Sequence, residues 1–411
     1  MSMPLAGGGQ RSNFATSQLP LDRLIRKEVA LGVIRERPYP EGHIGLTQIA
    51  PFLSVASDDV LFDYIKDGLS MGLAPARAED AESELSQKDV LVSGTGRASV
   101  IDWALKDEYS ASDVTRYRDD LIIRQALQGQ TLQLSGLSGY INDDWSPAAD
   151  LQSKVVRDDA RRRTMLDNRM EWLIMTAIET GKIVYNDGKI KFTVDFGRPA
   201  NQHEQAPASG LYNGTTHDPI GDIIALNQWM YDTYGFRFSR AITSRRVLMT
   251  LWKSSHFTTM AGVTAGTPST PIDPNYLLPG WGPQRAQQIV EDVTGVKFIE
   301  YDSIYRTRAV GSQTMQNNRF TSDNKIFFVP TDADLGITAP QPSGATLGVV
   351  DETQIGFAKT LTSPHPEGNW QSGYYEWEVE TKDPWQTVRG SGVKAFPVFP
   401  YMDHTYTLTV L

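Results

Sequence analysis

The sequence predicts an α+β fold, and three patterns along its 411 residues indicate this class. One uninterrupted stretch over 147–180 predicts a single long helix. The pair Asp187-Gly188 between alternating apolar runs predicts a β-hairpin over 182–196. Period-two alternation near the carboxyl end predicts several further strands. Helices and strands that occupy separate stretches of one chain are typical of α+β proteins.

The composition excludes several classes of protein. Apolar residues make up 40% of the chain and aromatic residues 10%, which is enough for a large core. No cysteine is present, so disulfides, thiol catalysis and cysteine-ligated metal sites are excluded. A net charge of −10 argues against a dedicated nucleic-acid binder, although it allows one locally basic face. The amino end lacks an apolar signal and no stretch suits a membrane span, so we expect a soluble cytoplasmic product.

The amino-terminal third predicts little regular structure. Residues 1–18 read as a flexible arm, 21–29 as a short amphipathic helix and 33–53 as extended chain. Nine acids and three bases lie between residues 57 and 89. This stretch is either a solvated loop or an excursion that contacts a basic surface on a neighbouring molecule. The candidate contact residues are Asp58, Asp59, Asp63, Glu82 and Glu84.

The long helix has clear predicted ends. Ser146 is the expected N-cap, Pro147 occupies the first helical position and Gly181 follows the last turn. At 1.5 Å per residue such a helix is roughly 50 Å long. An apolar stripe at helical spacing predicts its buried face: Leu166, Met170, Leu173, Ile174, Ala177 and Ile178.

Basic residues gather in and beyond the first half of this helix. They alternate with Asp158, Asp159 and Asp167, so one interpretation is a solvated face with pairs three and four residues apart. The other interpretation is a surface that faces a neighbouring subunit or an enclosed nucleic acid. The sequence favours neither interpretation over the other. The candidates are Arg157, Arg161, Arg162, Arg163 and Arg169.

The middle of the chain predicts a compact α+β domain. Asp218 and Pro219 open a helix that ends at Gly235, and Ser244 caps a second helix over 245–253. A third helix is expected over 283–295. The expected strands are 236–243, 296–302 and 325–330, with polar loops over 254–282 and 303–324.

The carboxyl-terminal part predicts strands. Residues 375–382 alternate strictly, which predicts a half-buried strand with Glu376, Glu378 and Glu380 on an acidic outer face. Two short strands are expected over 393–399 and 405–410.

No motif that carries catalytic chemistry is recognisable. The six histidines are scattered, and no spacing predicts a metal site. Neither a Walker A sequence nor a Gly-x-Ser-x-Gly elbow is present. We therefore expect no catalytic residue, no cofactor and no metal.

The order of these elements resembles the major capsid proteins of tailed bacteriophages, in particular the lambda E-type family with its Hong Kong 97-type capsid fold. The resemblance covers residues from about 45 to 411. The stretches that carry it are 181–198 with Tyr185 and Gly188, the unit from Ser244 to Trp252, strands 296–302 and 325–330, and the end over 392–410.

This resemblance implies a division of the chain and a set of partners. It implies an amino-terminal arm (1–48), an extended loop (49–110), a peripheral domain with the spine helix and hairpin (111–215), an axial domain (216–345) and peripheral return strands (346–411). Implied partners are other copies in hexamers and pentamers, packaged double-stranded DNA held without base reading, a separate scaffolding protein, a portal and a decoration protein. The implied location is the virion capsid, assembled in the host cytoplasm.

Two alternatives remain at this stage. One is an encapsulin-type compartment, which has the same fold, and particle size and DNA content would separate it from a phage shell. The other is an α+β enzyme with an unrecognised site, which should form a small defined oligomer. The segments 254–282 and 361–375 look longer than the family pattern and are expected to carry lattice or accessory contacts.

Overall fold

Nine stretches of the chain are described by the computed structural model, namely 27–66, 92–110, 147–186, 190–212, 217–251, 287–308, 315–337, 355–382 and 385–411. The chain divides into two compact units. The first comprises Met1–Arg37, Ala104–Arg163 and Tyr374–Gly392, and the second comprises Pro38–Trp103, Thr164–Gly373 and Val393–Leu411.

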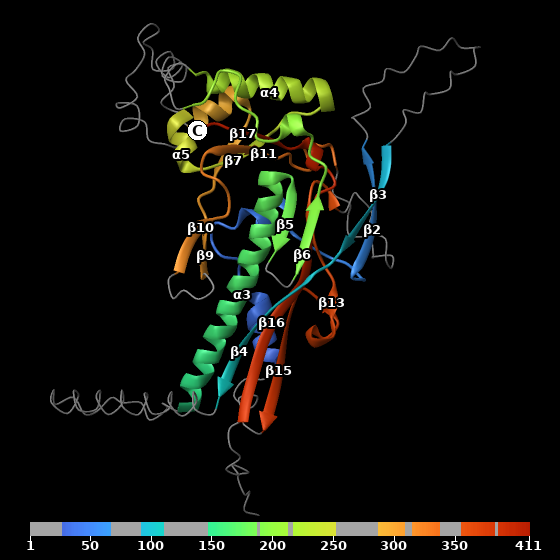
Figure 1. Ribbon diagram of the computed structural model, residues 1–411, viewed down its shortest axis with the longest axis vertical. Coiled ribbons are helices and arrows are strands. Elements are labelled where there is room, and N and C mark those ends of the chain that lie inside the picture. The colour runs from blue at the N-terminus through green and yellow to red at the C-terminus, as the bar shows by residue number, and fades with distance from the viewer. Residues whose placement is uncertain are drawn as a thin grey trace, which may run out of the picture. The chain divides into compact units, whose positions relative to one another are not determined.

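Helix α3 (Pro147–Thr180) confirms the predicted long helix at both ends (Figure 1). Gly181 follows it with φ of 72°, and its N–H donates to the Ala177 carbonyl at 2.8 Å. A left-handed residue is the usual end of a helix, and glycine adopts it without a steric cost. All six residues of the predicted apolar stripe are buried. The expected N-cap Ser146 lies outside the described residues.

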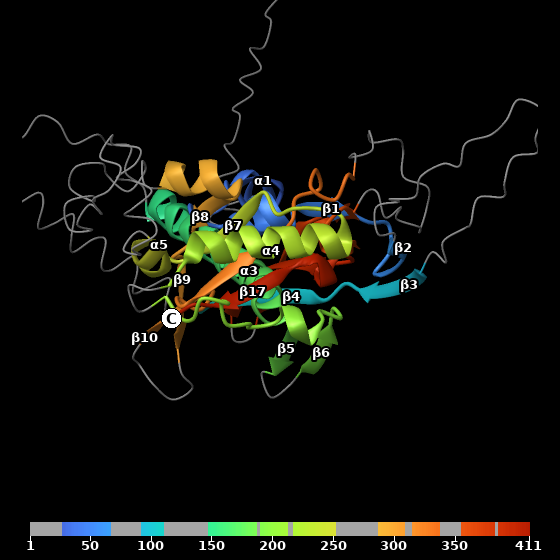
Figure 2. The ribbon, with the colours of Figure 1, turned by 90° about the horizontal axis from the view of Figure 1, so that it is seen from above.

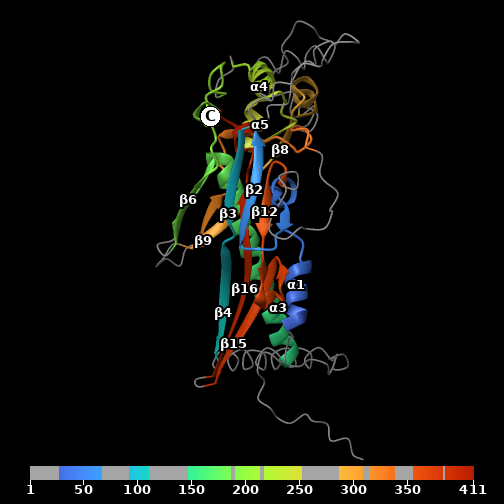
Figure 3. The ribbon, with the colours of Figure 1, turned by 90° about the vertical axis from the view of Figure 1, so that its right-hand side faces the viewer.

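The first unit contains a helix that packs on a strand. Helix α1 (Lys27–Glu36) lies along β15 (Tyr374–Lys382), as Figure 3 shows. Leu31 and Ile34 are buried, and the Arg35 Nε–H donates to the Tyr374 carbonyl at 3.1 Å. Strand β16 (Trp385–Val398) pairs with β15, and β4 (Asp102–Ser110) also pairs with β16.

The amino-terminal predictions need correction. The expected helix over 21–29 is instead α1, which extends to Glu36, while 21–26 lie outside the described residues. The segment 33–53 is not extended throughout, because a π-helical turn η2 (Gly45–Ile49) precedes β1 (Phe52–Ser54). Leu31 and Ile34 are three residues apart and bury one face of α1, and this packing outweighs the low helix propensity of Gly32.

The second unit contains a four-stranded sheet in the order β17-β11-β7-β8. Strands β7 and β8 are parallel, and β11 is antiparallel to both β7 and β17. This arrangement confirms three predicted strands of the middle domain, β7, β8 and β11, and the predicted carboxyl-terminal strand β17; all four are shorter than expected. Their bounds are β7 Arg240–Thr243, β8 Lys297–Glu300, β11 Lys325–Phe328 and β17 Tyr406–Thr409.

Helix α4 (Pro219–Tyr234) covers this sheet in Figures 1 and 2. Its predicted caps are confirmed: the Asp218 carboxylate accepts from the Gly221 N–H at 3.0 Å, and Gly235 has φ of 80°. Ile223 and Met230 bury their side chains in the same apolar cluster as the sheet residues Phe298 and Phe328. Helix α5 (Arg245–Leu251) begins after Ser244, whose hydroxyl accepts from the Val247 N–H at 3.2 Å. Trp252 lies outside the described residues.

Shorter strands complete the described fold. The predicted hairpin is confirmed as β5 and β6, although its Asp187-Gly188 turn lies outside the described residues. Strand β1 pairs in parallel with β12, and β12 pairs antiparallel with the end of β16. The bounds are β2 Asp59–Lys66, β3 Val92–Ser99, β5 Lys182–Asn186, β6 Lys191–Asp195, β12 Lys359–Thr362, β13 Pro364–His365 and β14 Gln371–Ser372, with 3₁₀ turns η3 Ala200–Gln202, η4 Pro366–Gly368 and η5 Met402–His404.

Two strand predictions were wrong. The segment expected to be a polar loop forms the hairpin β9 (Ile304–Arg308) and β10 (Met315–Arg319), whose mostly exposed residues lack the apolar alternation that marks a half-buried strand. On β15 the acidic side does not face outward throughout, because Glu376 is buried and Val379 is exposed. The next subsection gives the physical reason.

Candidate functional site

The basic residues of α3 separate into surface and interior groups. Arg157 is exposed, and the Arg161 side chain is 61% exposed. Arg162 and Arg163 are only 1% and 2% exposed, and the guanidinium of Arg163 stacks on the Tyr374 ring at 3.2 Å. Since these two groups do not reach the surface of the subunit, a role in contacting DNA or a neighbour stays a prediction for Arg157, Arg161 and the partly exposed Arg169.

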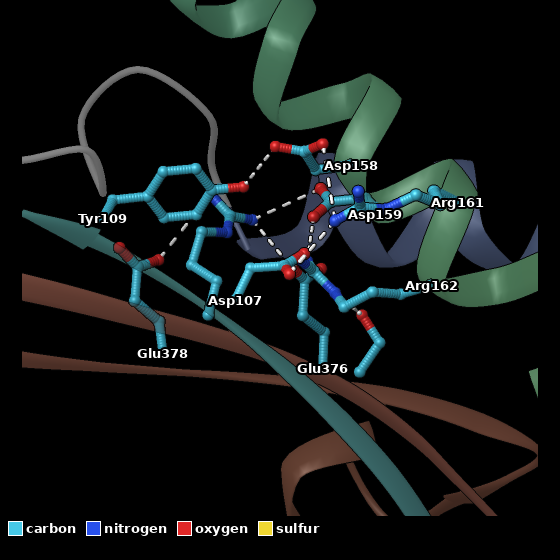
Figure 4. A network of polar contacts seen from close by, with 10 residues as sticks. Asp107, Tyr109, Asp158, Asp159, Arg161, Arg162, Glu376 and Glu378 are labelled. Carbon is cyan, nitrogen blue, oxygen red and sulfur yellow. Dashed lines mark hydrogen bonds and ion pairs between the residues drawn. The ribbon is translucent and has the colours of Figure 1, made fainter. Parts of the chain in front are cut away.

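Arg162 belongs to a buried ion-pair network in the first unit (Figure 4). It pairs with Asp159 one turn earlier and with Asp107 of β4 at 2.6 Å. Arg389 of β16 pairs with Glu376 at 2.6 Å and approaches Asp159 at 3.6 Å. The network therefore connects α3 with three strands, and the arginines explain why Glu376 faces inward.

A partly exposed rim surrounds these buried groups. The Tyr109 hydroxyl donates to Asp158 at 2.8 Å, and Arg161 pairs with Asp107 at 3.1 Å. Glu378 lies 3.8 Å from Arg389. Two buried arginines thus meet two buried carboxylates, while the rim contributes additional negative charge.

Burial controls the protonation of this network. Burial, together with the negative charge of Glu376, raises the pKa of Asp159 to about 6. Burial also raises the pKa of Glu376. Burial by itself would lower the pKa of Arg162, but the combined attraction of Asp159, Asp107 and Tyr109 outweighs it and the pKa is raised. With its pKa at about 6, the Asp159 carboxyl takes up a proton as the pH falls from 7.

A second anchor on α3 belongs to the other unit. The buried Glu171 carboxylate accepts from the N–H groups of Gly45 and Leu46 at 2.9 and 3.0 Å, and from the Tyr301 hydroxyl at 2.8 Å. Burial raises the pKa of Glu171 although these hydrogen bonds oppose the rise. Gly45 is required here, because a Cβ at this position would lie 2.6 Å from the carboxylate oxygen. This single side chain positions the η2 turn on the helix.

An open groove of about 410 Å³ lies beside the same half of α3. Arg169 lies along its wall, with its guanidinium carbon 5.3 Å from the ring centres of Trp172 and Tyr185. These distances are typical of cation–π contacts. The lining residues come from α3, β5 and β9: Met165, Asn168, Arg169, Trp172, Val184, Tyr185, Asn186, Tyr305, Arg306 and Thr307.

The acidic candidates have different environments. Asp58 accepts from Lys394 at 2.8 Å and from the Ser363 hydroxyl at 2.6 Å, and these bonds hold the pKa of its carboxyl below the usual value. Its charge is thus compensated within the subunit. Asp59 is exposed at the start of β2, and Asp63 lies further along that strand. Glu82 and Glu84 lie outside the described residues.

Other kinds of site were sought among the same residues. Within the nine described stretches, no group of three or more histidine, aspartate or glutamate residues could hold a metal ion. None of the helices described is long and apolar enough to cross a membrane.

The sequence indicated the Asp159–Arg162 pair three residues apart, but it did not reveal the distant partners of the buried arginines. Asp107 and Arg389 lie 55 and 227 positions away from Arg162 in the chain, so no local spacing links them. Two features of the sequence could have indicated such partners. The first half of α3 has more arginines than nearby acids that could pair with them, and β15 has glutamates at alternate positions. Such a pairing between distant elements is found only once the chain is folded.

The solved structures that are similar to this chain include capsid-related proteins. A candidate capsid protein of an E. coli CFT073 prophage has 13% identity and a TM-score of 0.50, covering 95% of this chain and 97% of that chain. A phage-related protein of Bordetella bronchiseptica RB50 has 12% identity and a TM-score of 0.48, covering 93% and 96%. A chain of the bacteriophage PhiM1 mature capsid has 11% identity and a TM-score of 0.42, covering 91% and 88%. No curated protein sequence matches the chain.

The class of protein follows from these observations. The spine helix, the hairpin and the capped middle domain form the Hong Kong 97-type fold of phage capsid proteins, as the resemblance implied. The profile of the family described as "Phage major capsid protein E" matches residues 31–374. The chain belongs to this family, and it is a structural protein that forms the capsid shell of a phage virion.

Proposed function

We propose that this chain assembles into hexamers and pentamers of an icosahedral or prolate shell around double-stranded DNA, and that it catalyses no reaction. The observation that carries the proposal is the family match, which extends over most of the chain. Assembly would take place in the host cytoplasm with a separate scaffolding protein, a portal and a decoration protein.

The internal contacts of helix α3 support a role as a shell subunit. Two independent anchors hold α3, namely the ion-pair network around Arg162 and the carboxylate of Glu171. A subunit in a closed shell contacts several neighbours, so individually weak interfaces act together. Within each unit, a segment of α3 that is already anchored loses less entropy when these contacts form, which strengthens each of them.

The proposed contact with DNA is electrostatic and independent of sequence. Phosphates bind Lys and Arg that can reach the surface. This binding weakens as the salt concentration rises, because the counterions that the protein releases from the DNA then gain less free energy. Arg157 and Arg161 of α3 are the exposed candidates for such a face. The charges of Arg162 are already neutralised inside the subunit.

Expression of the full chain, followed by negative-stain microscopy and sedimentation, tests the proposal. We expect capsomers or closed shells, and a well-defined small oligomer without shells would contradict the proposal and favour the enzyme alternative. Particles purified from phage-infected cells that express the chain can then be analysed for DNA. Long double-stranded DNA inside them is expected for a phage capsid and not for an encapsulin-type compartment.

A further inference from the structure

One exposed tryptophan stands out among the apolar side chains of the second unit. Trp370 is 72% exposed, which is the largest fraction among the large hydrophobic residues that the structure describes. It follows the η4 turn in the short β13–β14 hairpin, which we call the 364–373 loop. Exposed tryptophans are rare on surfaces that face only water, and they are common as interface anchors.

The 364–373 loop is ordered by its own hydrogen bonds. Pro364 is paired with Ser372, and His365 with Gln371. The Trp370 N–H donates to the His365 carbonyl at 3.1 Å, and the Asn369 N–H donates to the Pro366 carbonyl at 3.1 Å. These bonds fix the backbone from which the indole projects.

This presentation requires an unfavourable backbone conformation. Asn369 and Trp370 have φ of 56° and 55°, so two consecutive non-glycine residues are left-handed. This conformation is uncommon for a bulky side chain and costs free energy, so it needs a surrounding structure that imposes it. Strain of this kind persists where a function depends on the conformation.

The same chain offers a surface that suits an indole. The groove beside α3 has about 410 Å³ and aromatic walls from Trp172, Tyr185 and Tyr305. Met165 and Val184 line it and are 49% and 53% exposed, so its apolar wall is uncovered in a single subunit. The groove is not filled by the chain's own Trp370, which remains exposed.

Charge makes the two surfaces complementary. Glu367 lies three residues before the indole and is exposed. Arg169 and Arg306 line the groove, and an arginine face binds both a carboxylate and an aromatic ring. Each copy thus carries both an exposed indole and a groove that suits it. Two different surfaces that bind each other make a heterologous contact, which can repeat around a ring or a shell.

We propose that Trp370 of one copy inserts into the α3 groove of a neighbouring copy, with Glu367 facing the arginines of that groove. The inference rests on the shell-forming role and adds a specific contact to it. A second copy is the occupant because both complementary surfaces are present on each chain, in equal number and at the high local concentration of a shell.

Site-specific cross-linking tests this contact directly. The chain has no cysteine, so Trp370→Cys and Met165→Cys each introduce a unique thiol. Shells co-assembled from the two single variants and treated with a short bismaleimide should give a dimer on denaturing gels. Shells made from Trp370→Cys alone should not, and Val379→Cys with Met165→Cys provides a matched exposed control. Normal shells without the dimer would overturn the inference.

A second measurement addresses the energetic role of the indole. Trp370→Ala should weaken the pairwise contact by roughly 30-fold, which corresponds to about 2 kcal/mol at 1.4 kcal/mol per tenfold. The concentration needed for assembly should rise, the thermal unfolding of the unassembled subunit should be unchanged, and Trp370→Phe should restore part of the assembly. An unchanged assembly concentration, as expected if an accessory protein covers the groove, would refute the contact between copies. If the parent chain forms no shells at all, the proposed function fails, and this inference fails with it.

Discussion

Asp159 lies between two buried arginines and a second buried carboxylate, and this position determines its protonation. The arginines favour its charged form, whereas burial and Glu376 favour the neutral form more strongly. A folded-state pKa of about 6 is above the ordinary value of 3.8, so the folded chain binds this proton more tightly than the unfolded chain. The stability gained from binding this proton is therefore complete below the ordinary pKa of 3.8, and it is lost as the pH rises through about 6.

The variant Asp159→Asn makes this dependence measurable. A rise of roughly 2 pKa units corresponds to about 3 kcal/mol, so the free energy of unfolding of the parent, relative to the variant, should fall by up to that amount between pH 4 and pH 7. Urea unfolding of unassembled subunits at several pH values would show it. A difference that grows with pH would mean that the arginines dominate and that the pKa is lowered.

Gly390 is a second residue whose identity matters, because a Cβ at this position would overlap the indole of Trp377. We expect Gly390→Ala to lower the free energy of unfolding by about 1–3 kcal/mol through overpacking. Gly32→Ala is the matched control. Its Cβ would meet nothing within 4 Å in helix α1, so it should be neutral or stabilise by about 0.5–1 kcal/mol. Equal effects of the two variants in thermal unfolding would contradict this account.

At the scale of elements, helix α3 owes its attachments to a few polar side chains in addition to its apolar stripe. Glu171 satisfies two backbone N–H groups of the η2 turn, which has no other side-chain cap at its amino end. Buried N–H groups are costly when they lose their acceptor. The arginine network acts in the same way on the strands, although replacing a whole buried ion pair by apolar groups can be neutral, and only a broken pair is strongly destabilising.

For Glu171→Ala we expect a loss of about 1–3 kcal/mol per unsatisfied N–H and a local release of the η2 turn. Amide hydrogen exchange should become faster at Gly45 and Leu46, while Ala241 and Phe328 of the four-stranded sheet keep their protection. Glu171→Gln, which retains one acceptor, should have an intermediate effect. Unchanged exchange at Gly45 in the alanine variant would refute the anchoring role.

For the whole molecule, the acidic stretch before and along β2 remains a predicted intersubunit surface. Asp58 is already paired with Lys394, so a reversal of its charge would disturb the subunit itself. Asp59 and Asp63 are therefore the residues that test the contact. Charges at an interface mainly determine which partner binds and in which register.

The double variant Asp59→Lys with Asp63→Lys should give a subunit that unfolds like the parent but assembles poorly, because it would meet a basic neighbouring face with the wrong charge. Particle yield by sedimentation and unfolding by circular dichroism are the two measurements. The double variant Asp232→Lys with Asp292→Lys, at exposed positions of α4 and of the helical segment before Gly295, is a control of equal charge change outside the acidic stretch. Normal particle yield from the double variant would reject the predicted role of this stretch.

The sequence by itself determined those elements whose signals are local. Proline at the start and glycine after the end defined α3 at both ends, and Asp218 with Gly235 defined α4, because caps and helical periodicity act within a few residues. It also showed the family resemblance through the order of these elements, which the family match confirms.

Only the tertiary structure decided which charges are buried. Arg161, Arg162 and Arg163 are neighbours in the sequence, yet one is exposed and two are interior, since their directions on α3 differ by about 100° per residue. The inward turn of Glu376 depends on Arg162 and Arg389, which come from distant parts of the chain. Desolvation forces such charges to pair when distant elements pack, and no local pattern carries that information. The candidate surfaces for assembly, including the groove and Trp370, became visible for the same reason.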